Sequence, residues 1–553
     1  MKILAINQVS GLITWQHDAA AALVVDGKLV ASAEEERFNR QRHAKGYPTK
    51  AVEFCLKEGG LGISDIDVIA IGYNPYAYIR RASIQWSARG VLSRLSTPFI
   101  FKAKINELQK QAKKAKFIYI DHHLCHAASA YRCSGFEEAN VLTIDGAGET
   151  ESFAFFIGRN GKLERQWDIP FAEFFDSGAW RSIGQVYTSM TEFLKLGTHG
   201  EGKTMGLASY GEPVYDFSKI LNIKDHQTYT IDRRNLRKIY GHLERKSSSA
   251  EITVEHKNLA ASLQNALEEG IVNLAREAYQ KTGIKNFALA GGVALNCNTN
   301  SRILSQDFCD DIFIQPASND GGISLGAALE AMAIVGDGTH IEFDNAYLGS
   351  QYTNDEIEKV LKEAKVEYRK SDNIERETAE LVASGKMVGW FQGRMEIGPR
   401  ALGNRSILAN PCIKDIADKV NVNIKHREVW RPFAPSITAE DVTKYFEGVE
   451  KVKESPFMLH TFFVREQYRE KLPSITHVDG SSRIQTVTEK QNPRYYKYLK
   501  ELEKITGYPI TLNTSFNDAG EPIVCTPRDA LRCYFSTGFD ALVIGDFLLQ
   551  KNT

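Results

Sequence analysis

The sequence has no paired cysteines. Its eight cysteines are scattered singly along 553 residues, and none forms a CxxC pair. Zinc ribbons and disulfide frameworks need cysteines at short, repeated spacings. The cysteine pattern therefore predicts neither of these two kinds of protein.

The sequence also has no excess of charge of one sign. Its 68 basic and 69 acidic residues leave a formal net charge of −1. A broad nucleic-acid or membrane-binding surface needs an excess of lysine and arginine. We therefore expect no nucleic-acid partner and no membrane surface, although a local basic pocket is compatible with this balance.

Long hydrophobic runs are missing as well. The longest apolar stretches run about ten residues, too short to span a bilayer, and residues 1–11 resemble a strand rather than a signal peptide. We expect a cytoplasmic protein. A hydrophobic content of 43% and a charged content of 25% are typical of globular proteins, and the length predicts more than one domain.

A strand pattern occurs twice in the first part of the chain. Residues 2–36 predict a short strand and then a hairpin with its turn at Asp26-Gly27. Residues 141–169 repeat this order, with the second hairpin turning at Asn160-Gly161. Such internal similarity predicts two related halves in an α/β fold.

Glycine-rich turns follow several of the predicted strands. Residues 286–300 and 318–329 each combine paired glycines with a predicted helix start, where backbone amides can approach a phosphate. The alternative is that these glycines only permit tight packing of strand against helix. With the duplicated strands, the turns resemble the clamp fold of actin, sugar kinases and heat-shock ATPases over about residues 1–340. Candidate nucleotide-binding residues are Gly146, Gly148, Glu201, Lys203, Gly291, Gly292 and Asn296.

Residues 197–204, GTHGEGKT, match the P-loop pattern letter for letter. That pattern has its meaning only between a buried strand and a helix. Residues 185–196 have helical spacing instead, and glycine and proline follow too soon for a long helix. We therefore interpret the match as accidental and expect Glu201 and Lys203 to reach a ligand from a loop.

The segment 121–133, DHHLCHAASAYRC, predicts a metal site. His122 and His126 are four residues apart and share one face of a helix, whereas His123 points elsewhere. Asp145 and Asp320 each lie at or just beyond the end of an apolar strand and directly before glycine. Two histidines and two aspartates suit a divalent ion such as iron, manganese or zinc. The alternative for Asp145 is a simple turn residue.

A polar stretch at about 335–345 predicts a domain boundary. Beyond it we expect helices at 354–364 and 375–384 and strands at 387–392 and in 509–517. Basic residues then gather in segments interrupted by glycine and proline, where long side chains can converge on an anion. The alternative is a set of surface ion pairs. These residues are Arg394, Arg400, Arg405, Lys425, His426, Arg427 and Arg431.

Ten motifs, in order along nearly the whole chain, resemble the O-carbamoyltransferases of antibiotic and nodulation-factor biosynthesis, such as the tobramycin, cephamycin and novobiocin types. The motifs are HDAAAALV, EEERFNR, DHHLCHAASA, TIDGAGE, EGKTMGLASYG, AGGVALN, NDGGISLGAA, GRMEIGPRALGNRSILANP, WRPFAPS and LNTSFN.

This resemblance implies an α/β architecture with a duplicated clamp of the actin and sugar-kinase type (ASKHA) at residues 1–345 and a YrdC-like domain at 346–553. The YrdC-like domain is expected to make carbamoyl adenylate from carbamoyl phosphate and ATP. The clamp domain is then expected to pass the carbamoyl group to a hydroxyl of a small-molecule acceptor. Iron(II) is the metal that the resemblance favours, and magnesium is expected with ATP.

The resemblance also implies roles for individual residues. The metal ligands are His122, His126, Asp145 and Asp320. Carbamoyl phosphate is bound by Arg400, Arg431, Arg483, Asn513 and Ser515. The candidate catalytic residues are His17, Lys425 and Arg431, with His17 either as the base for the acceptor or as a turn residue bonded to backbone.

Two other functions remain open. Hydrogenase-maturation carbamoyl transfer uses related domains, but the sequence shows neither the acylphosphatase-like module nor the paired CxxC fingers of those proteins. A non-catalytic nucleotide-binding clamp is the second alternative, and it has no need for a second anion site. Residues 74–116 and 212–257 are our candidates for specificity toward the acceptor. For the assembly we name a homodimer only because dimers are the commonest oligomers.

Overall fold

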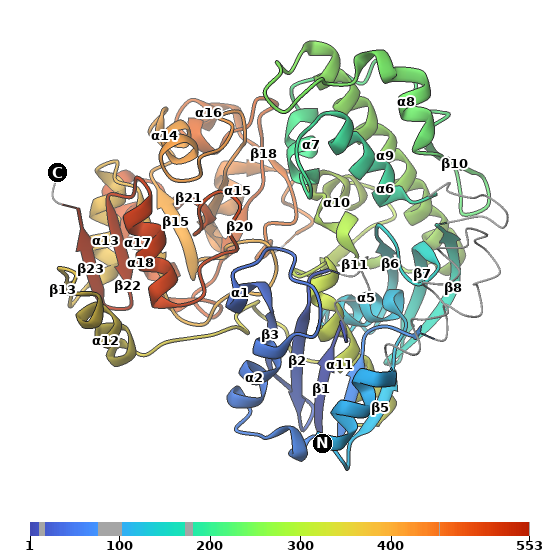
Figure 1. Ribbon diagram of the computed structural model, residues 1–553. Helices are drawn as coiled ribbons and strands as arrows, with labels where there is room; N and C mark the ends of the chain where they lie inside the picture. The colour runs from blue at the N-terminus through green and yellow to red at the C-terminus, as the bar shows by residue number, and fades with distance from the viewer. Residues whose placement is uncertain (10–16, 76–101, 172–180, 453, 552–553) are drawn as a thin grey trace. The chain divides into compact units, whose positions relative to one another are not determined.

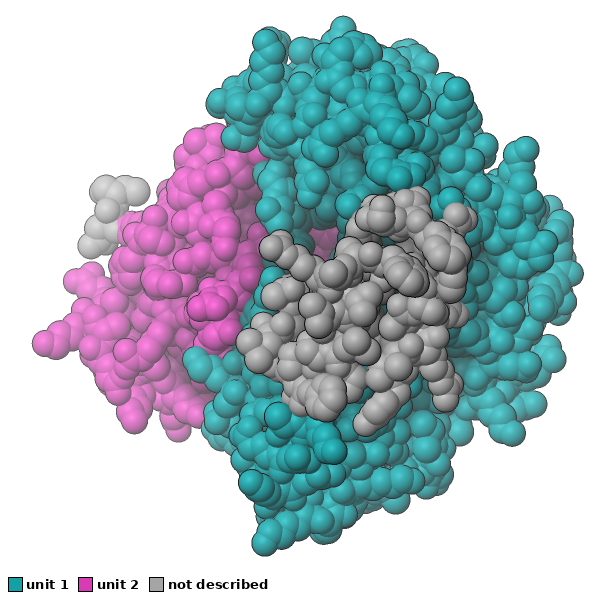
Figure 2. Space-filling model, turned by 45° about the vertical axis from the view of Figure 1, so that its right-hand side comes forward, with its two compact units in different colours: residues 1–35, 43–343 teal, residues 36–42, 344–553 magenta. Residues whose placement is uncertain are grey.

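The computed structural model describes residues 1–9, 17–75, 102–171, 181–452 and 454–551. It divides into two compact units (Figure 2): Met1–Glu35 with His43–Phe343, and Glu36–Arg42 with Asp344–Thr553. The division after Phe343 lies close to the boundary expected at 345. The short segment Glu36–Arg42, expected in the first domain, belongs to the second unit. Residues 76–101 of the segment proposed for acceptor specificity lie outside the described residues.

The first unit contains two five-stranded sheets (Figure 1). The first has the order β3-β2-β1-β4-β5, with bounds Lys28–Glu34, Ala20–Val25, Lys2–Ile6, Val68–Ile71 and Lys116–Tyr119. The second has the order β8-β7-β6-β11-β12, with bounds Lys162–Pro170, Glu151–Arg159, Glu138–Ile144, Asn286–Ala290 and Asp311–Ile314.

The two sheets share one pattern of strand directions. In each, three strands run antiparallel in chain order, the first of them pairs in parallel with a fourth strand, and the fourth pairs in parallel with a fifth. The hairpins turn where the sequence predicts, with positive φ at Asp26 and Gly27 (49° and 73°) and at Asn160 and Gly161 (51° and 70°). Asn, Asp and Gly tolerate this backbone best, so short-range chemistry determines both turns.

Two helices bring the candidate metal ligands together. Helix α5 (His122–Tyr131) contacts α11 (Ile323–Ile334), which also packs on β1 and β2. The close approach depends on Gly326, because a Cβ at this position would collide with the backbone carbonyl of Cys125 on α5. A glycine in one helix therefore determines how near the other helix lies.

The remaining elements of the first unit are mostly helical. They are α2 (Thr49–Glu58), η1 (Ile63–Asp65), α6 (Ile183–Phe193), α7 (Glu201–Ala208), β9 (Leu221–Ile223), β10 (Tyr229–Ile231), α8 (Arg234–Tyr240), η3 (Gly241–Leu243), α9 (Val254–Thr282), η4 (Gly292–Leu295), α10 (Cys297–Leu304) and η5 (Asp320–Gly322). The P-loop look-alike follows helix α6 rather than a strand, as the helical spacing predicts. Glu201 and Lys203 lie in helix α7, so the expectation of a loop was wrong. The short helix begins directly after Gly200 and continues despite the glycines within it.

The second unit is built on an eight-stranded mixed sheet. Its order is β13-β23-β22-β14-β15-β21-β16-β20, with bounds Arg369–Lys370, Phe547–Gln550, Ala541–Ile544, Val388–Phe391, Arg405–Ala409, Ile510–Ser515, Ala434–Thr438 and Gln485–Val487. A small sheet adds β17 (Phe446–Glu447), β18 (Phe462–Val464) and β19 (Ser481–Ser482). Buried Trp390, Tyr495 and Tyr498 belong to the apolar core that packs on the eight-stranded sheet.

Helices cover this sheet, and the predicted ones lie close to their expected bounds. They are α1 (Glu36–Asn39), α12 (Asn354–Ala364), α13 (Ile374–Ala383), α14 (Ile416–Asn423), η6 (Ala439–Asp441), α15 (Val442–Tyr445), α16 (Glu466–Arg469), η7 (Pro473–Ile475), α17 (Pro493–Thr506) and α18 (Pro527–Ser536). Helix α1 is held by Arg37, which donates to the Gly398 carbonyl at 2.7 Å, and by Phe38, which packs on Met395 and Ile523. Among the described residues, no helix has the length and apolarity needed to cross a bilayer.

Candidate functional site

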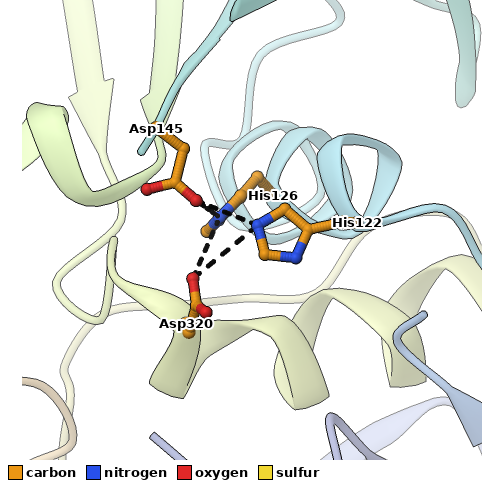
Figure 3. A group of neighbouring side chains, drawn as sticks. All are labelled: His122, His126, Asp145 and Asp320. Carbon is orange, nitrogen blue, oxygen red and sulfur yellow. Dashed lines mark hydrogen bonds and ion pairs between the residues drawn. The ribbon is translucent and has the colours of Figure 1, made fainter. Parts of the chain in front are cut away.

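Four side chains from three places in the chain meet in the first unit (Figure 3). His122 and His126 project from one face of α5, as their i, i+4 spacing predicts. Asp145 directly follows strand β6. Asp320 opens the short helix η5, six residues beyond β12, so it lies at a helix start rather than at a strand end as expected.

The four groups are close enough to share one ion. His122 Nε2 lies 2.9 Å from Asp145 Oδ2 and 3.7 Å from Asp320 Oδ1. His126 Nε2 lies 3.5 Å and 3.9 Å from the same two oxygens. All four candidate ligand atoms lie within 4.8 Å of one another. Both imidazoles therefore aim the same ring nitrogen at the two carboxylates.

The electrostatics of this cluster favour a cation. Burial alone would lower the pKa of His122, but the charges of Asp320 and Asp145 outweigh it and raise the pKa to about 9. Burial would raise the pKa of Asp145, yet the hydrogen bond to His122 and the nearby imidazole of His126 hold it well below its ordinary value. The two carboxylates thus create a buried field that stabilises positive charge.

His126 provides the test of whether a metal fits. Its side chain is fully buried, and within the described part of the chain neither ring nitrogen has a hydrogen-bond partner. A buried imidazole without a partner is costly, so such a group needs a reason to be there. A divalent ion at Nε2 would supply that nitrogen with a partner, and two imidazoles with two carboxylates form a donor set that suits iron, manganese or zinc.

Glu149, a buried residue that was not predicted from the sequence, holds the start of helix α5, which carries His122 and His126. Glu149 accepts hydrogen bonds from the backbone N–H of His122 at 3.0 Å and of Asn74 at 2.9 Å. Burial raises the pKa of Glu149 to about 7. His123 faces away, with Nδ1 2.7 Å from Thr143 Oγ1, as its position on the helix predicts. A glutamate just beyond the TIDGAG turn was the signal available in the sequence.

Two of the glycine turns border the four candidate metal ligands. Gly292 donates its N–H to Asp145 Oδ1 at 3.0 Å, so one of the expected nucleotide-binding turns also orients a metal-site carboxylate. Gly291 has φ +94°, and a Cβ there would collide with the Ile144 backbone. A Cβ on Gly148 would meet the ring of His123, whereas one on Gly146 would only approach Gln185. At Gly291 and Gly148 the packing role of glycine is therefore real, and it is compatible with a ligand-binding role.

The other nucleotide candidates have partners within the protein. Asn296 donates to Gln264 Oε1 at 2.9 Å and accepts from the Thr299 N–H at 3.1 Å, which caps helix α10. Glu201 accepts from Thr188 at 2.8 Å. Their nucleotide-binding roles, like that of Lys203, stay predictions.

His17 is at the edge of the metal cluster. Its Nδ1 lies 3.0 Å from Asp18 Oδ2 and 4.0 Å from Asp320 Oδ2. Burial opposes a charge on this imidazole, but the bond to Asp18 and the charge of Asp320 raise its pKa to about 10. The sequence analysis missed Asp18 as a partner, although it is the next residue in the chain.

In the second unit, half-buried arginines form a separate cluster. Burial lowers the pKa of Arg431, and the charges of Arg483 and Arg42 act in the same direction against Glu428. The pKa of Arg427 is lowered well below its ordinary value by burial and by Arg431. Such crowding of positive charge favours an anionic ligand.

Lys425 differs from these arginines, because its ammonium is already fully used. It donates to the Ser515 carbonyl at 2.7 Å and lies within 3.1 Å of Ser515 Oγ and of the Asn517 carbonyl, with Asn517 Oδ1 as a fourth acceptor. An ammonium has three protons to give. Lys425 therefore supports the loop after β21, and a catalytic role would need these bonds to open.

Asn513, Arg394 and Arg405 are hydrogen-bonded to other groups of the second unit. Asn513 donates to Ala401 O, Ser436 Oγ and Gln485 Oε1, while its own buried Oδ1 has no hydrogen-bond partner among the residues that the structure describes. Its bond to Ala401 ties β21 to the neighbour of Arg400. Arg394 and Arg405 donate to backbone carbonyls, including Leu348 O at 2.8 Å and Ser350 O at 3.0 Å, so they do not converge on an anion.

A mixed α/β fold with two charge clusters of opposite sign, one buried and one half-buried, is typical of an enzyme rather than of a structural protein. The chain belongs to the carbamoyltransferase family. Residues 8–329 match the family's "Carbamoyltransferase N-terminus" and residues 379–551 its "Carbamoyltransferase C-terminus". The protein is thus a transferase.

Relatives agree with this family. The chain is 38% identical to nodulation protein NolNO of Sinorhizobium fredii, over 98% of this chain and 80% of that protein. It is 28% identical to the 3'-hydroxymethylcephem-O-carbamoyltransferase of Amycolatopsis lactamdurans, over 97% and 98%. Among solved structures, HypF of T. kodakarensis is 12% identical, with a TM-score of 0.35 over 61% of this chain and 48% of that one.

Proposed function

We propose that the protein is an ATP-dependent O-carbamoyltransferase with two sites, one in each unit. The second unit, as a YrdC-like domain, activates the carbamoyl group. The first unit, as a duplicated clamp of the actin and sugar-kinase type, transfers it to a hydroxyl group. One observation carries this proposal. The four carboxylate and imidazole groups of the first unit favour a cation, whereas the arginines of the second unit favour an anion.

Activation suits the cluster of the second unit. Water hydrolyses carbamoyl phosphate to carbamate and inorganic phosphate, and a carbamate oxygen then attacks the α-phosphorus of ATP to form carbamoyl adenylate and expel pyrophosphate. Arg431 and Arg483 are the side chains we assign to the anionic groups, since arginine binds phosphate and carboxylate oxygens bidentately. The unpartnered Oδ1 of Asn513 is suited to accept an N–H of the carbamoyl group.

Transfer suits the cluster of the first unit. His122, His126, Asp145 and Asp320 hold the divalent ion, for which iron(II) is our first choice. When bound, such an ion supplies positive charge that stabilises the departing nucleotide phosphate. Asp145 is oriented by the Gly292 amide, and His122 is held by the helix end that Glu149 caps. Rigid ligands of this kind keep their geometry through the reaction.

The reaction has a measurable first step. Pure protein incubated with ATP, carbamoyl phosphate and a divalent ion is expected to release pyrophosphate before any acceptor is added. A non-catalytic clamp would bind ATP without releasing pyrophosphate, and that result would overturn the proposal. Screening hydroxylated natural products for the mass gain of one carbamoyl group then identifies the acceptor.

A further inference from the structure

A second group of possible metal ligands lies beside the first. His17, Asp18 and His43, all in the first unit, offer ligand atoms within 4.8 Å of one another. His43 Nδ1 lies 2.7 Å from Asp18 Oδ1, and His17 Nδ1 lies 3.0 Å from Asp18 Oδ2. Two imidazoles thus flank one buried carboxylate, which is a donor set that transition metals accept.

Asp320 lies between the two groups. Its Oδ1 faces His122 and His126, at 3.7 and 3.9 Å from their Nε2 atoms. Its Oδ2 lies 4.0 Å from Nδ1 of His17, in the second group. The two oxygens of one carboxylate therefore face different ligand groups, as they do in a carboxylate that bridges two metal ions.

The backbone around the second group is strained in three places. Asp18, His43 and His199 have positive φ values of 58°, 53° and 55°. His199 stacks on His43, with ring centroids 3.7 Å apart. Left-handed backbone is uncommon outside glycine, and such residues gather where function requires them. The three residues lie in separate loops, and their side chains meet in one cluster.

We propose that His17, Asp18 and His43 hold a second divalent cation, and that Asp320 bridges it to the ion at His122, His126 and Asp145. Centres with two ions stabilise both the attacking and the leaving oxygen of a transfer reaction. The second ion would bind the acceptor hydroxyl and lower its pKa. This role rests on the proposed function, whereas the existence of the site rests on the ligand geometry alone.

A competing explanation needs no second ion. Asp18 also accepts from Asn319 Nδ2 at 3.0 Å, so a hydrogen-bond network can by itself orient both imidazoles. The two explanations differ in the number of ions bound. They also differ in the effect of His43, which is a ligand in one and only a hydrogen-bond partner in the other.

The test counts Mn²⁺ ions bound to the full-length protein by equilibrium dialysis followed by elemental analysis. We expect two ions per chain in the unchanged protein and one in His43→Asn. Asparagine tolerates left-handed backbone, so this substitution keeps the strained turn. His199→Asn is the matched control, because it also replaces a left-handed histidine of the cluster, yet one outside the ligand group; it is expected to keep two ions.

Electron paramagnetic resonance provides an independent measurement. Two Mn²⁺ ions bridged by one carboxylate are magnetically coupled, which broadens the six-line signal of an isolated ion. His43→Asn is expected to restore the isolated signal. One ion per unchanged chain, or two ions retained in His43→Asn, would overturn the second site.

Failure of this inference is distinguishable from failure of the proposed function. A protein that binds one ion, releases pyrophosphate and carbamoylates an acceptor would refute the second site alone. A protein that binds two coupled ions but releases no pyrophosphate would support the site and refute the proposed reaction.

Discussion

The two charge clusters of this protein are opposites. In the first unit, carboxylates dominate, and the pKa of the His122 imidazole rises to about 9 despite burial. In the second unit, cations dominate, and the pKa values of Arg427 and Arg431 fall. Buried charge is expensive unless something compensates it. The difference in sign is the reason that we propose a cation as the ligand of the first cluster and an anion as the ligand of the second.

The largest effect expected is in the first cluster. His126→Ala removes one of the four candidate ligands, and we expect the metal affinity of this site and carbamoyl transfer to fall by about 100-fold, with the loss of one bound ion, while pyrophosphate release continues. Elemental analysis and acceptor assays measure this split. His123→Gln is the control, because His123 lies on the same helix but faces Thr143. Unchanged metal content in His126→Ala would break the comparison.

The reciprocal change tests the second cluster. Arg431→Ala is expected to slow pyrophosphate release by about 100-fold, since a donor to the anion is lost, while metal content stays the same. Arg376, an exposed arginine paired with Glu380, provides the control substitution Arg376→Ala. Normal activation kinetics in Arg431→Ala would mean that the arginines serve only the fold.

A smaller effect is expected from the helix contact beneath the metal ligands. Gly326→Ala forces α5 and α11 apart, and we expect a loss of about 1–3 kcal/mol in the free energy of unfolding with weaker Mn²⁺ binding. Chemical denaturation and metal titration measure the two consequences. Gly202→Ala is matched, because a Cβ at this helical position meets nothing within 4 Å and should leave stability equal or higher. Full Mn²⁺ affinity in Gly326→Ala would contradict the role of this contact.

The smallest effect concerns pH and the second unit. Burial lowers the pKa of His460 to about 4, whereas an unfolded histidine has a pKa of about 6.5. The unfolded state therefore binds the proton first as the pH falls. The stabilisation is present above about pH 6.5 and is lost between there and pH 4, by up to about 3 kcal/mol.

Urea unfolding at pH 7 and pH 4.5 measures this loss. His460→Gln is expected to lose less stability than the unchanged protein over that interval. The exposed His242 provides the control substitution His242→Gln, which should keep the full pH dependence. Equal pH dependence in the His460 variant would exclude His460 as the group responsible.

Local patterns were enough to predict much of the fold. Both hairpins turn at their predicted dipeptides, and helix α12 has the predicted bounds, 354–364, because Thr353 and Glu356 form a capping box. The four-residue spacing of His122 and His126 also predicted correctly that both lie on one face of a helix, because this depends only on the helical period. The helical character of Glu201 and Lys203 was missed, because the glycines around them suggested a loop.

Residue type and local period were enough to select the candidate side chains: the imidazoles, the aspartates and the arginines. Only the tertiary structure decided that Asp320 enters the cluster from a helix start, that Gly326 lets α5 and α11 approach, and that Asp18 and His43 join His17. Likewise, only the structure assigned Arg394 and Arg405 to backbone carbonyls and Arg431 to a crowded cation cluster. The physical reason is that these contacts join residues tens to hundreds of positions apart, and packing rather than local propensity determines such distances.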